Sequence, residues 1–146
     1  FNELYTIYNE SRSDEDKSRI IAGMVNIRDR QGLRQALNLL LSDKVKKQDI
    51  RSITASTTNY ENRDMIWSWF AENYSYLRKI YAGSGVLPRI ISSLVPFVGL
   101  TREKEVKEFF KNNPAPEASM GISVGLEMLE VFSAFYDLLR SSSASL

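Results

Sequence analysis

Apolar residues recur along most of this chain at steps of three and four, the spacing of one face of an α-helix. The pattern is strongest in residues 62–81, which also hold both tryptophans. The residues that share this face are Ile66, Trp69, Phe70, Leu77, Ile80 and Tyr81. We therefore predict a central packing helix at 62–81, around which the other elements are arranged.

Three amphipathic helices are predicted before this segment. A short apolar face in residues 4–8 is followed by Ser13, with Asp16 three residues later, the arrangement of a helix-capping box. Asp29 is the next candidate cap, and the apolar stripe in residues 33–41 that follows it has helical period. The chain should therefore enter within a first short helix, and further helices should begin near Ser13 and Asp29.

Residues 50–58 are harder to interpret from their composition. They alternate briefly between apolar and polar and are rich in β-branched side chains, which favours a strand on propensity. We nevertheless predict a helix, because a single strand among helices would have no partner, whereas small Ser, Thr and Ala side chains let a helix pack closely. Asn62 is then predicted to cap the central helix, which should end near Gly83.

Two shorter helices are predicted next. The first begins at Ser84, tolerates Pro88 in its first turn and ends at Pro96 and Gly99. The second is charged and capped by Thr101.

The segment 113–116 contains two prolines and should stop this second helix. Residues 117–140 are apolar on more than one face, which predicts a long, largely buried closing helix. The last residues, 141–146, are predicted to be a disordered tail.

These predictions add up to an all-α fold of about eight helices. The first capped starts come at even intervals, with about 33 residues per helix pair, which is typical of solenoids. We predict a single domain over residues 1–140, an antiparallel helical array of the HEAT or armadillo α-solenoid kind, with a closed helical bundle as the alternative.

The composition narrows the classes of function. Nineteen basic and eighteen acidic residues leave a net charge of +1, which argues against a nucleic-acid or anionic-membrane partner. There is no histidine and no cysteine, so the usual general base, thiolate chemistry and disulfides are absent. The longest apolar run, 86–100, is interrupted by Pro88, Arg89 and Pro96 and is too short to span a bilayer. No stretch carries a recognisable catalytic constellation.

Three segments carry a resemblance to a known family. They are residues 42–50 (SDKVKKQDI), 59–73 (NYENRDMIWSWFAEN) and 105–114 (EVKEFFKNNP). In order and spacing they resemble the C-terminal helical domain of zinc aminopeptidases of the aminopeptidase N type, which include tricorn-interacting and endoplasmic-reticulum aminopeptidases. The pair Arg63-Asp64 before Trp67, and the pair Phe109-Phe110 before an Asn-Pro break, are the most specific parts.

The resemblance implies a piece of an exopeptidase that removes amino-terminal residues from peptides. In that family the catalytic zinc lies in a separate domain, so this chain should hold no cofactor and should not hydrolyse peptides alone. The helical domain would wall and gate the peptide chamber, with the catalytic domain of the same parent chain and the peptide substrate as its partners. The start at Phe1 indicates a fragment or processed piece. The lack of cysteine and of a signal segment leads us to expect a cytoplasmic location.

The same resemblance places residues 50–59 and 84–98 on the concave, peptide-facing side. An arginine there can pair bidentately with a peptide carboxylate, and hydroxyl or amide groups can bond its backbone. The residues predicted to contact peptide are Arg51, Thr54, Thr58, Asn59 and Arg89. The alternative is that the arginines are merely solvated and the threonines pack.

Two further alternatives stay open. Trp67 and Trp69 point to different sides of a helix, so at most one is expected fully in the core, and the other would contact a neighbouring helix or form a ligand platform. The whole chain could instead be a free-standing helical-repeat adaptor that binds another protein. An adaptor should end in polar capping helices, whereas a severed domain should expose apolar surface around Phe1, Leu4 and Tyr5.

Overall fold

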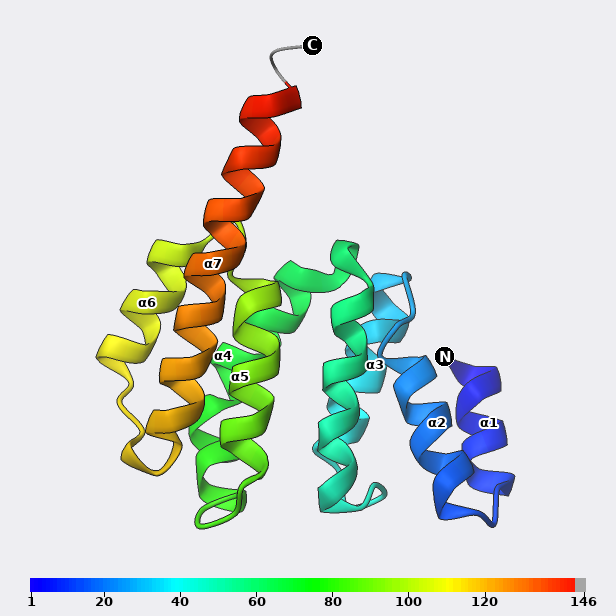
Figure 1. The fold of residues 1–146 in the computed structure, drawn as a ribbon. Coiled ribbons are helices and arrows are strands. Elements are labelled where there is room, and N and C mark those ends of the chain that lie inside the picture. The colour runs from blue at the N-terminus through cyan, green and yellow to red at the C-terminus, as the bar shows by residue number, and fades with distance from the viewer. Residues whose placement is uncertain (144–146) are drawn as a thin grey trace. The chain divides into compact units, whose positions relative to one another are not determined.

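Helices make up all the regular structure in the part of the chain that the structure describes. A computed structural model describes residues 1–143, apart from the side chain of Thr58, and contains seven α-helices and the long 3-10 helix η1 over that range (Figure 1). The predicted all-α fold is therefore confirmed. The chain forms two compact units, Phe1–Asn73 (unit 1) and Tyr74–Leu146 (unit 2). The HEAT-like arrangement and the single domain over 1–140 stay predictions.

Unit 1 contains three α-helices, two 3-10 helices and the start of a fourth α-helix. In order these are α1 (Asn2–Glu10), α2 (Asp14–Met24), α3 (Arg30–Leu40), η1 (Lys47–Thr58), η2 (Tyr60–Asn62) and the first part of α4 (Arg63–Ile80). The Ser13 side chain accepts a hydrogen bond from the Asp16 N–H, and Asp29 Oδ2 accepts one from the Gly32 N–H at 2.6 Å. Both predicted helix starts are confirmed.

Residues 47–58 are helical as predicted, but the helix is of the 3-10 type. Ile50, Ile53 and Ser56 are all buried, at 0–1% exposure, and their spacing of three residues is the repeat of a 3-10 helix. The Thr54 and Thr57 hydroxyls also donate to carbonyl oxygens three residues earlier, at 2.8 and 2.7 Å. The narrow buried face explains why β-branched residues are accommodated here.

The predicted cap at Asn62 is displaced. Asn59 accepts from the Glu61 N–H and caps the 3-10 turn η2, which leads into α4. Asn62 is instead buried, and its amide donates to the carbonyl of Ile27 at 3.0 Å. Its role is to tie the loop after α2 to the start of α4.

Both tryptophans of α4 lie in the core, which contradicts the expectation that only one could. Trp67 is 3% exposed and Trp69 is 6% exposed, and Trp67 stacks with Phe70. A wide arc of the α4 surface is therefore buried. Other fully buried side chains of unit 1 include Ile21, Met24, Leu33, Leu37, Ile53 and Ile66.

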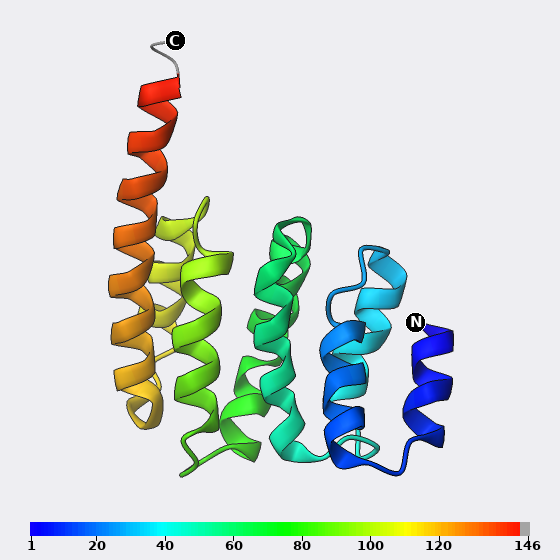
Figure 2. The same ribbon diagram turned by 45° about the vertical axis from the view of Figure 1, so that its right-hand side comes forward.

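Unit 2 starts within α4 and continues with α5 (Val86–Val98), α6 (Glu103–Asn112), η3 (Pro116–Ala118) and α7 (Ser119–Ser143). The helices α5, α6 and α7 lie side by side (Figures 1 and 2). Helix α7 approaches α5 closely through a glycine, since a Cβ added to Gly121 would meet the carbonyl oxygen of Pro88 at 2.2 Å.

Of two predicted helix boundaries in unit 2, the end at Gly99 is confirmed and the cap at Thr101 is wrong. Pro96 lies inside α5, which ends at Val98 with Gly99 as its C-cap. A proline so close to the end removes only one intrahelical hydrogen bond, so the helix tolerates it. The residue before α6 is Arg102, not Thr101, and the structure shows no side-chain cap there.

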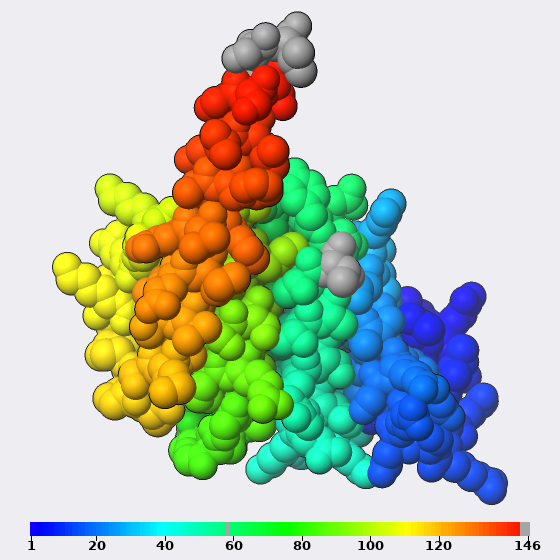
Figure 3. Space-filling view, viewed as in Figure 1, coloured from blue at the N-terminus to red at the C-terminus, as the bar shows by residue number. Residues whose placement is uncertain are grey.

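Helix α7 differs from its prediction in two ways. The helix runs on to Ser143, so residues 141–143 are helical rather than part of a disordered tail, and 144–146 lie outside the described residues. It is also mostly exposed rather than buried. Its end projects beyond α5 and α6, in orange to red (Figure 3), and Val131, Phe135 and Leu138 in this part are 59–61% exposed.

Candidate functional site: a polar cleft between α3 and α4

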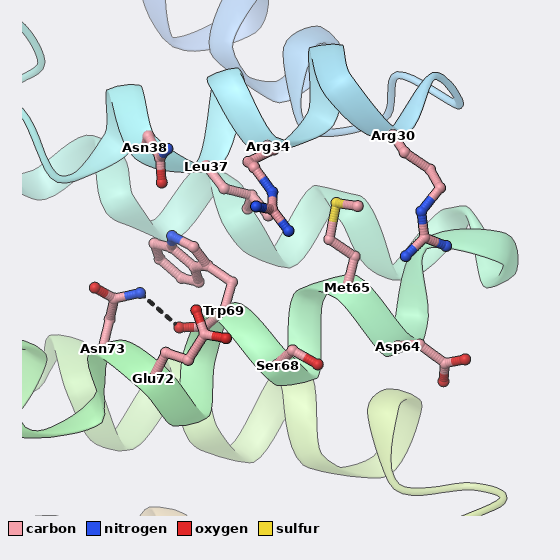
Figure 4. A pocket seen from close by; sticks show the side chains of 10 residues that line it. All are labelled: Arg30, Arg34, Leu37, Asn38, Asp64, Met65, Ser68, Trp69, Glu72 and Asn73. Carbon is pink, nitrogen blue, oxygen red and sulfur yellow. Dashed lines mark hydrogen bonds between the residues drawn. The ribbon is translucent and has the colours of Figure 1, made fainter.

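A cleft of about 490 Å³ opens between α3 and the first part of α4, within unit 1 (Figure 4). Its lining consists of Arg30, Arg34, Leu37, Asn38, Asp64, Met65, Ser68, Trp69, Glu72 and Asn73. The volume falls in the range of about 300–1,000 Å³ that is usual for small-molecule sites.

The α3 wall is built from the polar side of that helix. Arg30, Arg34 and Asn38 recur every four residues, which places them along one face, while Leu33 and Leu40 bury the opposite side. Neither arginine forms an ion pair or hydrogen bond with residues of the described part. This wall therefore presents two uncompensated guanidinium groups.

The α4 wall repeats the same spacing with the opposite charge. Asp64, Ser68 and Glu72 are also four residues apart and line the cleft, but only the Glu72 carboxylate lies on the side toward α3, whereas the Asp64 carboxylate points away from it (Figure 4). The Glu72 carboxylate is thus the anionic group on the side of the cleft opposite the arginines.

Trp69 forms the base of the cleft at its Asn38 end. The indole is 6% exposed, and its nitrogen, turned toward α3 beside Asn38 (Figure 4), has no hydrogen-bond partner. The Asn73 amide donates to the Trp69 carbonyl at 2.8 Å, which holds the backbone of this turn. A buried N–H without an acceptor is rare in folded proteins, because its desolvation is uncompensated.

None of the residues predicted to contact peptide lines this cleft. The exposed Arg51 donates from Nε to the Gln48 carbonyl at 3.2 Å, and Thr54 donates to the Arg51 carbonyl at 2.8 Å. The Asn59 amide donates to the carbonyl of Asn26 at 3.2 Å. The Thr58 side chain lies outside the described residues. Arg89 is exposed on α5 in unit 2, so only Arg51, Thr54 and Asn59 are brought together, along η1 and just after it.

The sequence did contain a signal for the cleft. Polar residues recur every four positions in both helices, at 30, 34 and 38 and at 64, 68 and 72. Each stripe alone resembles an ordinary solvated helix face. The sequence could not reveal that the two stripes line the same cleft, with Trp69 at its base.

Within residues 1–143 the structure contains no group of three or more acidic side chains arranged to hold a metal ion. Over the same residues, no helix combines the length and apolar character needed to cross a membrane.

Comparison with known proteins connects the chain to one family. The family model described as "ERAP1-like C-terminal domain" matches residues 1–131. The chain is 34% identical over 131 residues to Probable aminopeptidase 2 of Sulfurisphaera tokodaii, covering 89% of this chain and 17% of that protein. It is 34% identical over 134 residues to Leucyl aminopeptidase of Saccharolobus solfataricus, covering 90% of this chain and 17% of that protein.

A third relative is less similar in sequence. The chain is 29% identical over 139 residues to Tricorn protease-interacting factor F2 of Thermoplasma volcanium, covering 94% of this chain and 18% of that protein. The chain therefore spans less than a fifth of the length of these relatives.

Proposed function

The chain belongs to the family of ERAP1-like C-terminal domains, and we propose that it is a non-catalytic wall of the peptide chamber in a zinc metallo-aminopeptidase. The family match and the relatives show that it corresponds to the C-terminal domain of aminopeptidase-family proteins. The parent enzyme would remove N-terminal residues from peptides, and this domain would shape and gate access to its active site.

The observation that carries this proposal is the exposed apolar surface of α7. Val131, Phe135 and Leu138 are 59%, 59% and 61% exposed. Soluble monomers rarely leave a contiguous apolar patch of this kind uncovered, and a free-standing repeat protein ends in polar capping helices. The surface therefore suits a domain that the rest of a larger chain covers, and it disfavours the adaptor.

This surface is not where the sequence led us to expect it. Phe1, Leu4 and Tyr5 are half-buried, because Phe1 stacks on Tyr5 and Tyr5 on Tyr8, at ring-centre distances of 5.6 and 6.4 Å. The larger uncovered surface belongs to α7.

The zinc of the parent enzyme would be held outside this chain. The described residues offer no set of ligands that fits the ion. The domain's own contribution would be contacts with peptide through Arg51, Thr54, Thr58, Asn59 and Arg89, and a cytoplasmic location remains our expectation.

The proposal is tested by an aminopeptidase assay with fluorogenic amino-acid amides. The chain would be measured alone and mixed with the zinc-binding catalytic fragment of the same parent. We expect no activity from the chain alone, and a changed rate or peptide-length preference on mixing.

A double variant, Phe135→Asp with Leu138→Asp, should lose the effect of mixing while keeping its helical circular dichroism, because both side chains are exposed. Arg19→Gln, an exposed change on α2, is the matched control and should behave as wild type. Activity from the chain alone, or mixing without any effect, would contradict the proposal.

A further inference from the structure

We propose that the cleft between α3 and α4 binds a small zwitterion, an amino acid or dipeptide with one carboxylate and one ammonium group. The cleft contains the three kinds of group that such a ligand needs. These are two guanidinium groups along one wall, a carboxylate on the facing wall and an unsatisfied buried donor at the Asn38 end.

The α3 wall would take the carboxylate. Arg30 and Arg34 are one helical turn apart and are not engaged by other residues of the described part. A guanidinium group matches the geometry of a carboxylate and binds it through two parallel N–H donors. Such an arrangement favours a carboxylate over a neutral amide.

Trp69 adds a buried polar group to the two exposed charged walls. Its indole N–H is buried and without an acceptor, and it is turned toward α3 beside the exposed side chain of Asn38 (Figure 4). A ligand oxygen seated between Arg34 and Asn38 would accept this hydrogen bond. Binding would then remove the free-energy cost of an unsatisfied buried donor.

The α4 wall would take the ammonium group. The Glu72 carboxylate faces the arginine side of the cleft, with the Ser68 hydroxyl one turn earlier (Figure 4). Walls of opposite charge disfavour a ligand that carries charges of only one sign. A zwitterion satisfies both walls at once.

The choice of ligand rests on the proposed function, because an aminopeptidase releases free amino acids and works among short peptides. The site would then let the domain respond to the products of its own parent enzyme. The evidence for a charged ligand comes only from the residues that line the cleft and does not depend on the proposed function.

The two tryptophans make a direct test possible. In the Trp67→Phe variant, the single indole N–H signal in a ¹H–¹⁵N NMR spectrum reports Trp69. The chain would be titrated with leucine and with leucyl-leucine. The comparison ligands would be N-acetyl-leucine, which lacks the ammonium group, and N-acetyl-leucinamide, which lacks both charges.

We expect a saturable shift of the Trp69 indole signal with leucine or leucyl-leucine, and weaker binding of both acetylated ligands. Arg34→Gln should weaken binding about tenfold, the effect of one lost charge-assisted hydrogen bond. Arg19→Gln, which lies on α2 outside the cleft, should leave affinity unchanged. If Trp67→Phe does not fold, the same signal can be assigned in the wild-type chain by its loss in Trp69→Phe.

No shift with either zwitterion would overturn the proposal. Equal binding of N-acetyl-leucinamide, or a shift unaffected by Arg34→Gln, would overturn it as well. The measurement involves no hydrolysis and no catalytic fragment. A negative result would therefore leave the chamber-wall proposal standing, and failure of the mixing assay would leave the measured binding unchanged.

Discussion

Helices α3 and α7 carry apolar side chains at the same spacing but bury them very differently. In α3 the side chains of Leu33, Leu37 and Leu40 are 1–4% exposed. In α7 only Gly121, Gly125 and Leu129 are buried, and the larger apolar residues on either side of them reach solvent. Helical period therefore indicates that a segment is a helix, but not that its apolar face is covered.

The contrast arises from the means by which each helix meets its neighbours. Leucine side chains of α3 fill the interior of unit 1, so its packing depends on side-chain volume. Helix α7 meets α5 through glycines, which bring the two backbones together and leave the bulky residues of α7 pointing elsewhere. Two measurements test this contrast, and a third tests an ion pair of unit 2.

The largest effect is expected from truncating one leucine of α3. Leu37→Ala should lower the free energy of unfolding by about 2–5 kcal/mol, because it removes a fully buried side chain and leaves a cavity. Phe135→Ala in α7 should change it by less than about 0.5 kcal/mol, because that ring is 59% exposed. Urea denaturation followed by circular dichroism would measure both. Comparable losses in the two variants would mean that α7 is covered in solution.

A smaller effect is expected from adding one methyl group at the close approach of α5 and α7. Gly121→Ala should destabilise the chain by about 1–3 kcal/mol, because the new Cβ would meet backbone atoms of Pro88 at 2.2–2.7 Å. Gly23→Ala in α2 is the matched control, since a Cβ there meets nothing within 4 Å.

The control should stabilise the chain by about 0.5–1 kcal/mol through helix propensity. Thermal unfolding of both variants would provide the comparison. If both alanines were stabilising, the glycine contact between α5 and α7 would be absent.

The smallest effect is expected on the pH dependence of the folding stability of unit 2. Arg78 donates to both carboxylate oxygens of Glu117, at 2.6 and 3.2 Å, and this contact lowers the pKa of Glu117 below its usual value. A carboxyl group whose pKa is lower in the folded state contributes stability above its unfolded pKa and loses it as the pH falls through the folded value. Glu117→Gln should therefore weaken the acid dependence of unfolding between neutral pH and about pH 3.

Solvent and salt reduce this contribution, because both side chains are one-third exposed. Glu15→Gln is the control: Glu15 pairs with Arg19 within α2, but both side chains are more than 70% exposed. An identical pH profile for wild type and Glu117→Gln would show that the Arg78–Glu117 pair adds nothing to stability.

Local chemistry could be predicted from the sequence where it involves near neighbours along the chain. Ser13 and Asp29 cap helices as predicted, because a cap needs only a short polar side chain two or three residues before a backbone N–H. The helical nature of 47–58 was also predicted, but its 3-10 type depends on a core that accepts only the narrow face of Ile50, Ile53 and Ser56. Likewise, Asn62 bonds Ile27 across the fold, which no local rule predicts.

The sequence was sufficient for the all-α class, the approximate helix positions and the family resemblance, since all of these follow from residue spacing and order. Tertiary structure alone decided which apolar faces are covered and which polar stripes meet. The polar stripes of α3 and α4 become a cleft only because the two helices pack side by side with Trp69 between them. The apolar residues in the second half of α7 become a surface because this part of the helix extends beyond its neighbours in unit 2. Both outcomes depend on contacts between residues far apart in the chain, which neither periodicity nor composition contains.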